Sequence, residues 1–83
     1  MNIKPLQKDI AAYARKRRLF KKWEKARRLL ENDIRHPSLE TELLEPHWRG
    51  IYSFRIDKKY RALFFIDKDG NVEIFKITNH YKK

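Results

Sequence analysis

Two arginines in the second half of the chain lie in segments that otherwise have the alternating apolar pattern of β-strands. Arg55 lies in the segment 52–56 and Arg61 in the segment 60–66. A charged side chain within a strand costs free energy unless an anion or other polar partner meets it. Because a guanidinium group binds phosphate by forked, charge-assisted hydrogen bonds, this pair predicts a phosphate site.

The expected register places both arginines on one side of a sheet. If Phe54 and Phe64 face the core together, strict alternation turns Arg55 and Arg61 to the opposite side. A three-residue loop at Asp57–Lys59 then makes them direct cross-strand neighbours. Like charges in that position destabilise a sheet, and a bound phosphate would relieve the repulsion.

A third strand is predicted over Val72–Thr78. If Asp67 pairs with Val72 across a four-residue loop, even-numbered residues of this strand, including Lys76, join the arginine side. The chain then leaves the sheet near His80. The alternative interpretation is an ordinary solvated sheet face that carries surface charges.

Apolar residues in the first part of the chain recur at helical spacing. They form two stripes that are out of phase around Arg15–Arg18, which predicts two helices with a break there. Pro5 suits the first turn of the first helix. The competing interpretation is a single long helix, which would leave half of its apolar residues in water. Trp23 has the phase of the second stripe and is expected in the core. The stripes are Leu6, Ile10, Tyr13, Ala14 and Leu19, Trp23, Ala26, Leu30.

These elements define an α+β fold in which a helical pair packs on one face of a small antiparallel sheet. Eighty-three residues fill one core, so residues 1–83 are expected to form a single domain. Leu39–Leu44 is a candidate for an additional extended edge segment. Ile3 is all that remains of any N-terminal strand, which is therefore very short or absent.

The formal net charge of +10 favours polyanionic partners, with nucleic acid first, an acidic protein second and an anionic membrane surface third. The chain has no cysteine, so neither a disulfide nor a thiolate metal site is expected. His36 and His47 are flanked by prolines and show no ligand spacing, and no metal or cofactor is predicted. No apolar run approaches a membrane span, and we expect a cytoplasmic protein.

The motif Trp48-x-Gly-Ile-Tyr-Ser-Phe-Arg-Ile56, followed by Tyr60-Arg-Ala-Leu-Phe64 and by a terminal His80-Tyr81 pair, resembles the RelE/ParE superfamily of toxins. The nearest branch is that of the YoeB/Txe-like mRNA interferases, which act at the ribosome. The resemblance covers nearly the whole chain and implies the same helical pair and antiparallel sheet. One departure is the short start, because family members usually open with a longer strand.

In the nucleases of that superfamily the 2′-hydroxyl of the RNA attacks the adjacent phosphate without a metal. This chemistry requires a base, an acid for the 5′-oxygen and positive charge at the phosphoryl oxygens. The resemblance implies that Arg61 clamps the phosphate, with Arg55 beside it. It also implies that His80 and Tyr81 act as general acid and substrate-orienting group. Glu42 occupies the position of the base.

A shift of one or more residues in that match would substitute Glu40 or Glu45 for Glu42 as the base. Trp48 is equally suited to stacking on a base and to covering the sheet edge.

The segment from Arg15 to Arg28 holds nine Lys/Arg and one acid. Such a run is often only a solvated face, but its density favours contacts with ribosomal RNA phosphates. The candidate RNA-binding residues are Lys21, Lys22, Lys25, Arg28, Trp48, Arg49 and Lys76.

Three functions follow from the resemblance. The first is a ribosome-associated endoribonuclease toxin that cleaves mRNA and thereby inhibits translation. The second is a ParE-like toxin that inhibits DNA gyrase without acid–base residues, and the terminal His-Tyr pair argues against it. The third is an inactive, basic RNA-binding relative. A toxin also implies a cognate acidic antitoxin that masks the basic surface.

Overall fold

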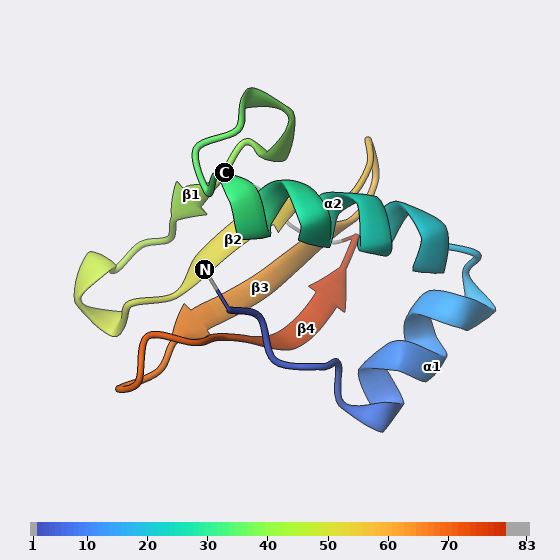
Figure 1. Cartoon of the computed structure of the whole chain (residues 1–83), viewed down its shortest axis with the longest axis horizontal. Helices are drawn as coiled ribbons and strands as arrows, with labels where there is room; N and C mark the ends of the chain where they lie inside the picture. Colours follow the sequence, from blue (N-terminus) through green and yellow to red (C-terminus); the bar gives the residue numbers. More distant parts are fainter. Residues whose placement is uncertain (1, 80–83) are drawn as a thin grey trace.

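The computed structural model describes residues 2–79 of the chain, which form two α-helices followed by a four-stranded antiparallel sheet (Figure 1). The strands lie in the order β1-β2-β3-β4. This arrangement confirms the predicted α+β fold. The elements are α1 (Lys8–Lys16), α2 (Phe20–Asn32), the 3-10 turn η1 (Pro37–Leu39), β1 (Glu42–Leu43), the 3-10 turn η2 (His47–Arg49), β2 (Tyr52–Arg55), β3 (Arg61–Ile66) and β4 (Val72–Thr78).

The helical region breaks between α1 and α2, as the two stripes predicted. Arg18 has a φ of 59°, a left-handed conformation that ends the first helix. The single-helix interpretation is therefore wrong. The prediction for Pro5 is also wrong, because α1 begins at Lys8 and Pro5 precedes it. Leu6 still packs against the core, so the apolar stripe extends beyond the helix that it helped to predict.

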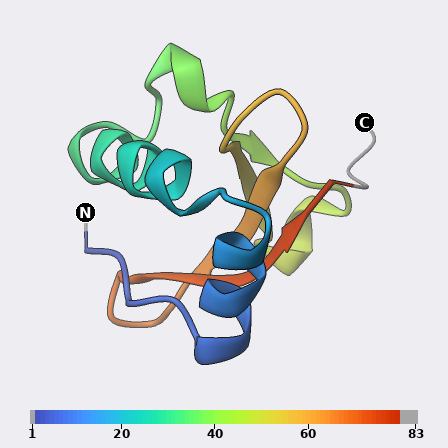
Figure 2. The same ribbon diagram turned by 90° about the vertical axis from the view of Figure 1, so that its right-hand side faces the viewer.

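Both helices pack on one face of the sheet, α2 across it and α1 against β4 (Figures 1 and 2). Trp23 is almost fully buried, as predicted, and its ring contacts Phe54 at a centroid distance of 6.0 Å. Phe54 in turn contacts Phe64 at 5.7 Å. Burying an aromatic or large aliphatic side chain contributes about 1.5–3 kcal/mol, so this cluster fixes which face of the sheet is covered.

The β2–β3 hairpin has the predicted register. Arg55 pairs with Arg61, and the amide of Ile56 donates to the carbonyl of Tyr60 at 3.0 Å, which closes a loop at residues 57–59. Asp57 stabilises the loop because its carboxylate accepts the amides of Lys59 and Tyr60, both at 2.8 Å.

The β3–β4 register differs from the prediction. Ile66, not Asp67, pairs with Val72, so the first even-numbered residues of β4 face the core. An irregularity opposite Leu63 and Phe64 then shifts the phase by one residue, and Lys76 pairs with Leu63. Lys76 therefore does lie on the arginine side, for a different reason from the one expected.

The N-terminal segment runs parallel to β4 but makes only an isolated bridge, between Ile3 and Val72. This confirms that an N-terminal strand is almost absent. The ammonium group of Lys4 anchors the segment to Asp67 at 2.9 Å and to Glu73 at 3.2 Å. The pKa of Asp67 lies below its usual range, chiefly because of Lys4 and then because its carboxylate accepts the amide of Asn71.

Candidate nucleic-acid interface

The face of the sheet opposite the helices carries four of the predicted site residues, in two rows. Side chains directly opposite each other on neighbouring strands point to the same side. The first row crosses the strands from Glu42 through Ser53 and Leu63 to Lys76. The second row contains Arg55, Arg61 and Thr78. The predicted convergence of Arg55, Arg61 and Lys76 on one side is therefore present, and the register places Glu42 there as well.

Glu40 relieves the electrostatic repulsion between the cross-strand residues Arg55 and Arg61. Its carboxylate accepts a hydrogen bond from Nη1 of Arg55 at 2.6 Å, and its main-chain carbonyl accepts one from Nη2 of Arg61 at 2.5 Å. Arg61 also donates from Nε to the hydroxyl of Ser53 at 3.0 Å. The sequence predicted that some group must compensate the two charges and named a bound phosphate as one that would; in the structure protein groups already contact both guanidinium groups. The pair tolerates its register without a ligand.

The position of Glu40 depends on a local turn. It ends η1 in the left-handed conformation, with a φ of 45°. The turn is fixed on both sides, because Nδ1 of His36 accepts the amide of Ser38 at 3.1 Å and the hydroxyl of Thr41 donates to the carbonyl of Ile34 at 2.7 Å. These contacts direct both the carbonyl and the carboxylate of Glu40 toward the arginines.

The three candidate glutamates are placed differently. Glu40 is bound to Arg55, whereas Glu45 is 88% exposed and lies 3.5 Å from the imidazole of His47. Glu42 pairs with Ser53, the same serine that accepts a hydrogen bond from Arg61. Glu42 is thus the one of the three whose strand position faces the arginines.

His80 and Tyr81 lie outside the described residues. The strand that precedes them ends at Thr78, which pairs with Arg61. The polypeptide therefore leaves β4 beside the arginine pair.

Trp48 and Arg49 lie in η2, which ends at Gly50 with a φ of 66°. Trp48 is 84% exposed, which is unusual for a large aromatic side chain. The interpretation that it covers the sheet edge is therefore wrong. An exposed indole has its π-face available to a partner.

The basic residues of α2 lie on the helix surface. Lys21, Lys25 and Arg28 are exposed, and Lys22 is exposed as well but pairs with Asp57 at 3.0 Å. The pKa of Asp57 is below its usual range. Partial burial opposes this shift, but hydrogen bonds from the amides of Tyr60 and Lys59 and from Lys22 outweigh it.

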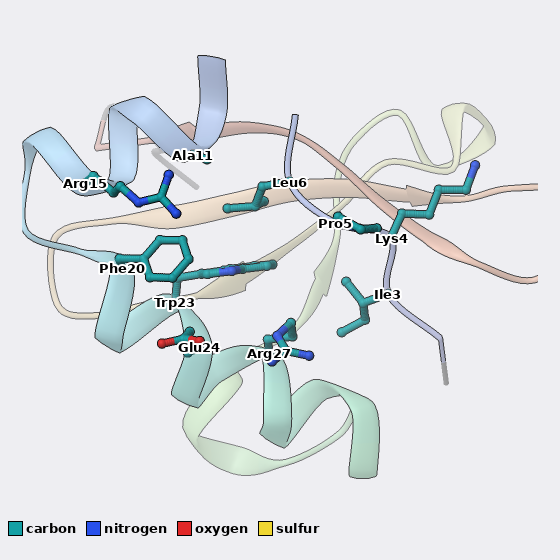
Figure 3. Close-up of a pocket in the computed structure, with 10 residues that line it drawn as sticks. All are labelled: Ile3, Lys4, Pro5, Leu6, Ala11, Arg15, Phe20, Trp23, Glu24 and Arg27. Atoms are coloured by element: carbon teal, nitrogen blue, oxygen red, sulfur yellow. The ribbon is translucent and has the colours of Figure 1, made fainter. Parts of the chain in front are cut away.

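A hollow of about 360 Å³ lies between the N-terminal segment, α1 and α2 (Figure 3). Its apolar lining includes Leu6, Phe20 and Trp23. Two of its three lining cations are paired with carboxylates: Lys4 with two of them, and Arg27 with Glu31 at 3.2 Å. The third, Arg15, lies over the ring of Phe20 at 4.5 Å, and the carboxylate of Glu24 also lines the hollow. This hollow therefore does not offer an anion site.

The histidines within the described part of the chain act as turn residues, as expected. His36 caps η1 and His47 begins η2. Among residues 2–79 there is no group of three His, Cys, Asp or Glu side chains arranged to hold a metal ion. Over the same residues, no helix has the length and apolar character needed to cross a membrane.

No model of a protein family and no curated protein sequence matches the chain. Solved structures do. A YoeB/ParE toxin from Agrobacterium tumefaciens superposes with a TM-score of 0.71 at 18% identity, over 98% of this chain and 100% of that one. The YoeB dimer from Staphylococcus aureus superposes with a TM-score of 0.60 at 26% identity, over 96% and 94% of the two chains.

The chain therefore has the α+β fold of the RelE/ParE toxin superfamily. Within that superfamily its structural neighbours are toxins of the YoeB-like branch, as the sequence motifs predicted.

Sequence reasoning missed two residues of the interface. The sequence motifs give Ser53 no role, although it is fully buried and its hydroxyl accepts a hydrogen bond from Arg61. The signal that could have revealed this role is the presence of a serine in an otherwise apolar strand, on the side of the sheet that carries the arginines. For Glu40 the sequence suggests only the role of a base. Its main-chain contact with Arg61 depends on a left-handed turn that the sequence does not mark with glycine or asparagine.

Proposed function

We propose that the protein is the toxin of a toxin–antitoxin system and a ribosome-associated endoribonuclease that cleaves mRNA in the cytoplasm. The observation that carries the proposal is the grouping of Arg55, Arg61 and Glu42 on the face of the sheet opposite the helices. Two guanidinium groups on adjacent strands can neutralise the phosphoryl oxygens. A carboxylate on the next strand can accept a proton.

In this mechanism the 2′-hydroxyl of the RNA loses its proton to the carboxylate of Glu42 and attacks the adjacent phosphorus. Arg61 and Arg55 stabilise the negative charge that grows on the phosphoryl oxygens, which requires no metal ion. His80 protonates the departing 5′-oxygen, and Tyr81 orients the substrate. Removing one hydrogen-bond donor that stabilises such a developing negative charge typically slows a reaction by about 10²–10³-fold.

The surroundings of the arginine pair supply substrate binding. Lys76 lies in the row that contains Ser53 and Leu63. It adds positive charge on the arginine side, on the edge strand β4. Trp48 stacks on a base, with Arg49 beside it on η2. The basic face of α2 contacts ribosomal RNA phosphates, which contribute affinity without sequence information.

The net charge of +10 also supports a cognate acidic antitoxin that covers the basic surface. A small acidic protein encoded beside this chain is the expected partner. Its co-expression should abolish toxicity, and the two proteins should purify together at low salt.

The test is expression of the wild type, Arg61→Ala and His80→Ala in cells, with growth curves and mapping of mRNA 5′ ends. The wild type should arrest growth and create new 5′ ends within translated reading frames, and both variants should grow normally. Lys68→Ala changes an exposed turn residue and serves as the expression control. If Arg61→Ala and His80→Ala remain toxic, the nuclease mechanism is wrong, and a toxin that acts without acid–base chemistry takes its place.

A further inference from the structure

A second hollow, of about 400 Å³, lies between α2, η1 and the end of the β2–β3 hairpin. We call it the hairpin hollow. Its polar lining consists of Lys22 and Lys25 from α2, Ser38 from η1, and Arg55 and Asp57 from the hairpin. The apolar part of its lining is formed by Ala26, Leu29, Leu39 and Ile56.

Three cations and one carboxylate, that of Asp57, line the hairpin hollow, the same numbers as in the hollow in Figure 3. The two hollows differ in which of these groups are already paired. Asp57 is occupied by two amides of its own loop and by Lys22. Within residues 2–79, no carboxylate pairs with Lys25. Arg55 is paired with Glu40, which lies outside the lining, so Lys25 is the cation that leaves the hollow with positive charge.

Arg55 connects the hairpin hollow to the arginine pair. It lines the hollow, and it also lies directly opposite Arg61 on the outer face of the sheet. A single strand of RNA held by Arg61 would thus have a neighbouring backbone unit within reach of Arg55 and of the hollow beyond it. Because the apolar lining lies beside the cations, the hollow can accept a sugar together with its phosphate.

We propose that the hairpin hollow is a second phosphate subsite, which binds the RNA phosphate next to the one at Arg61. Lys25 is its principal cation, and the hydroxyl of Ser38 donates a hydrogen bond to the same phosphate. This proposal rests on the proposed function and assigns Lys22 and Lys25 to the substrate. Lys21 and Arg28, on the same helix, do not line the hollow and remain candidates for contact with ribosomal RNA phosphates.

The sharpest variant is Lys25→Gln, since Lys22 also stabilises the hairpin through Asp57. Glutamine and lysine have similar helix propensities, so α2 should be preserved. Lys8→Gln, an exposed lysine of α1, makes the same chemical change away from the hollow and is the matched control. The probe is a fluorescein-labelled hexanucleotide RNA with 2′-O-methyl groups, which cannot be cleaved by 2′-hydroxyl attack.

Lys25→Gln should weaken binding of this RNA about fivefold and lower the slope of log Kd against log salt by about 0.7, the value for one phosphate contact on a single strand. Lys8→Gln should change neither quantity. A second series replaces each phosphate in turn with an uncharged methylphosphonate. At one position the replacement should weaken binding to the wild type but not to Lys25→Gln, because the contact is already lost.

Equal affinities for Lys25→Gln and Lys8→Gln would overturn the subsite, and so would methylphosphonate effects that are the same in the wild type and in Lys25→Gln. Displacement of the RNA by polyglutamate from the wild type but not from Lys25→Gln would assign the hollow to an acidic protein instead. Cleavage is read separately with unmodified RNA. RNA that binds with the predicted pattern but stays intact would refute the nuclease and leave the subsite standing.

Discussion

The ion pair between Glu40 and Arg55 predicts that Glu40→Gln tightens RNA binding. In the free protein the carboxylate of Glu40 holds Nη1 of Arg55 at 2.6 Å, so it competes with a phosphate for the same guanidinium group. Glutamine keeps the shape of the side chain but loses its charge. The main-chain carbonyl that accepts a hydrogen bond from Arg61 is unchanged.

The expected magnitude follows from solvent exposure. The side chains of Arg55 and Glu40 are 36% and 49% exposed, and exposed ion pairs contribute about 0.2–1 kcal/mol. Because 1.4 kcal/mol corresponds to a tenfold change in affinity, Glu40→Gln should lower the Kd for a short single-stranded RNA by about 1.5- to fivefold. The free energy of unfolding should fall by less than about 1 kcal/mol.

The assay is fluorescence anisotropy with an uncleavable RNA, together with single-turnover cleavage of unmodified RNA. Glu45→Gln removes the same charge from a side chain in the next loop that is 88% exposed and, among residues 2–79, forms no ion pair with either arginine, so it measures the effect of net charge. Weaker binding by Glu40→Gln would mean that the carboxylate holds Arg55 in place instead of competing for it. A cleavage rate reduced more than about tenfold would mean that Glu40, and not Glu42, is the base.

Three further variants test the interface and the fold. Trp48→Ala should leave thermal stability unchanged because the side chain is 84% exposed, yet weaken RNA binding by about 1–3 kcal/mol if a base stacks on it; an unchanged Kd contradicts stacking. Asp67→Asn should destabilise the protein at pH 7, since Lys4 and then the amide of Asn71 lower the pKa of Asp67. A carboxyl with a lowered pKa contributes its full stability above the usual value, about 3.9, and this contribution is lost as pH falls through the lowered pKa. The difference in the free energy of unfolding should therefore shrink steadily as pH is lowered below about 3.9, and a difference that does not change with pH contradicts the assignment. Phe54→Ala should lower the free energy of unfolding by about 3–5 kcal/mol in urea titrations, and a loss below 1 kcal/mol contradicts its central place in the core.

The register of the arginine pair could be predicted from the sequence because two independent constraints agree. Alternation of apolar residues fixes which side of each strand is buried, and the short loop at residues 57–59 fixes which residues are opposite. The register of β4 could not be predicted in the same way. Its core residues Val72, Ile74 and Ile77 are spaced by two and then by three, and only the second spacing indicates an irregularity.

The groups that offset the repulsion between Arg55 and Arg61 could not be predicted, because they depend on the tertiary contacts of the turn that contains Glu40. A charged pair in a strand indicates that some partner must exist, but not whether the partner is a ligand or the protein itself. Here Glu40 and Ser53 supply it. The start of α1 could not be predicted either, because Pro5 is compatible with both a first helical turn and an extended segment before the helix.

The central claim is that the guanidinium groups of Arg55 and Arg61 hold one phosphate together. It is tested most directly by a double-mutant cycle of Arg55→Ala and Arg61→Ala, measured as the Kd for the uncleavable RNA. If both groups bind the same phosphate, each single variant should lose affinity, and the double variant should lose less than the sum by about 0.5 kcal/mol or more. Losses that add fully, or single variants that bind as tightly as the wild type, would contradict the claim.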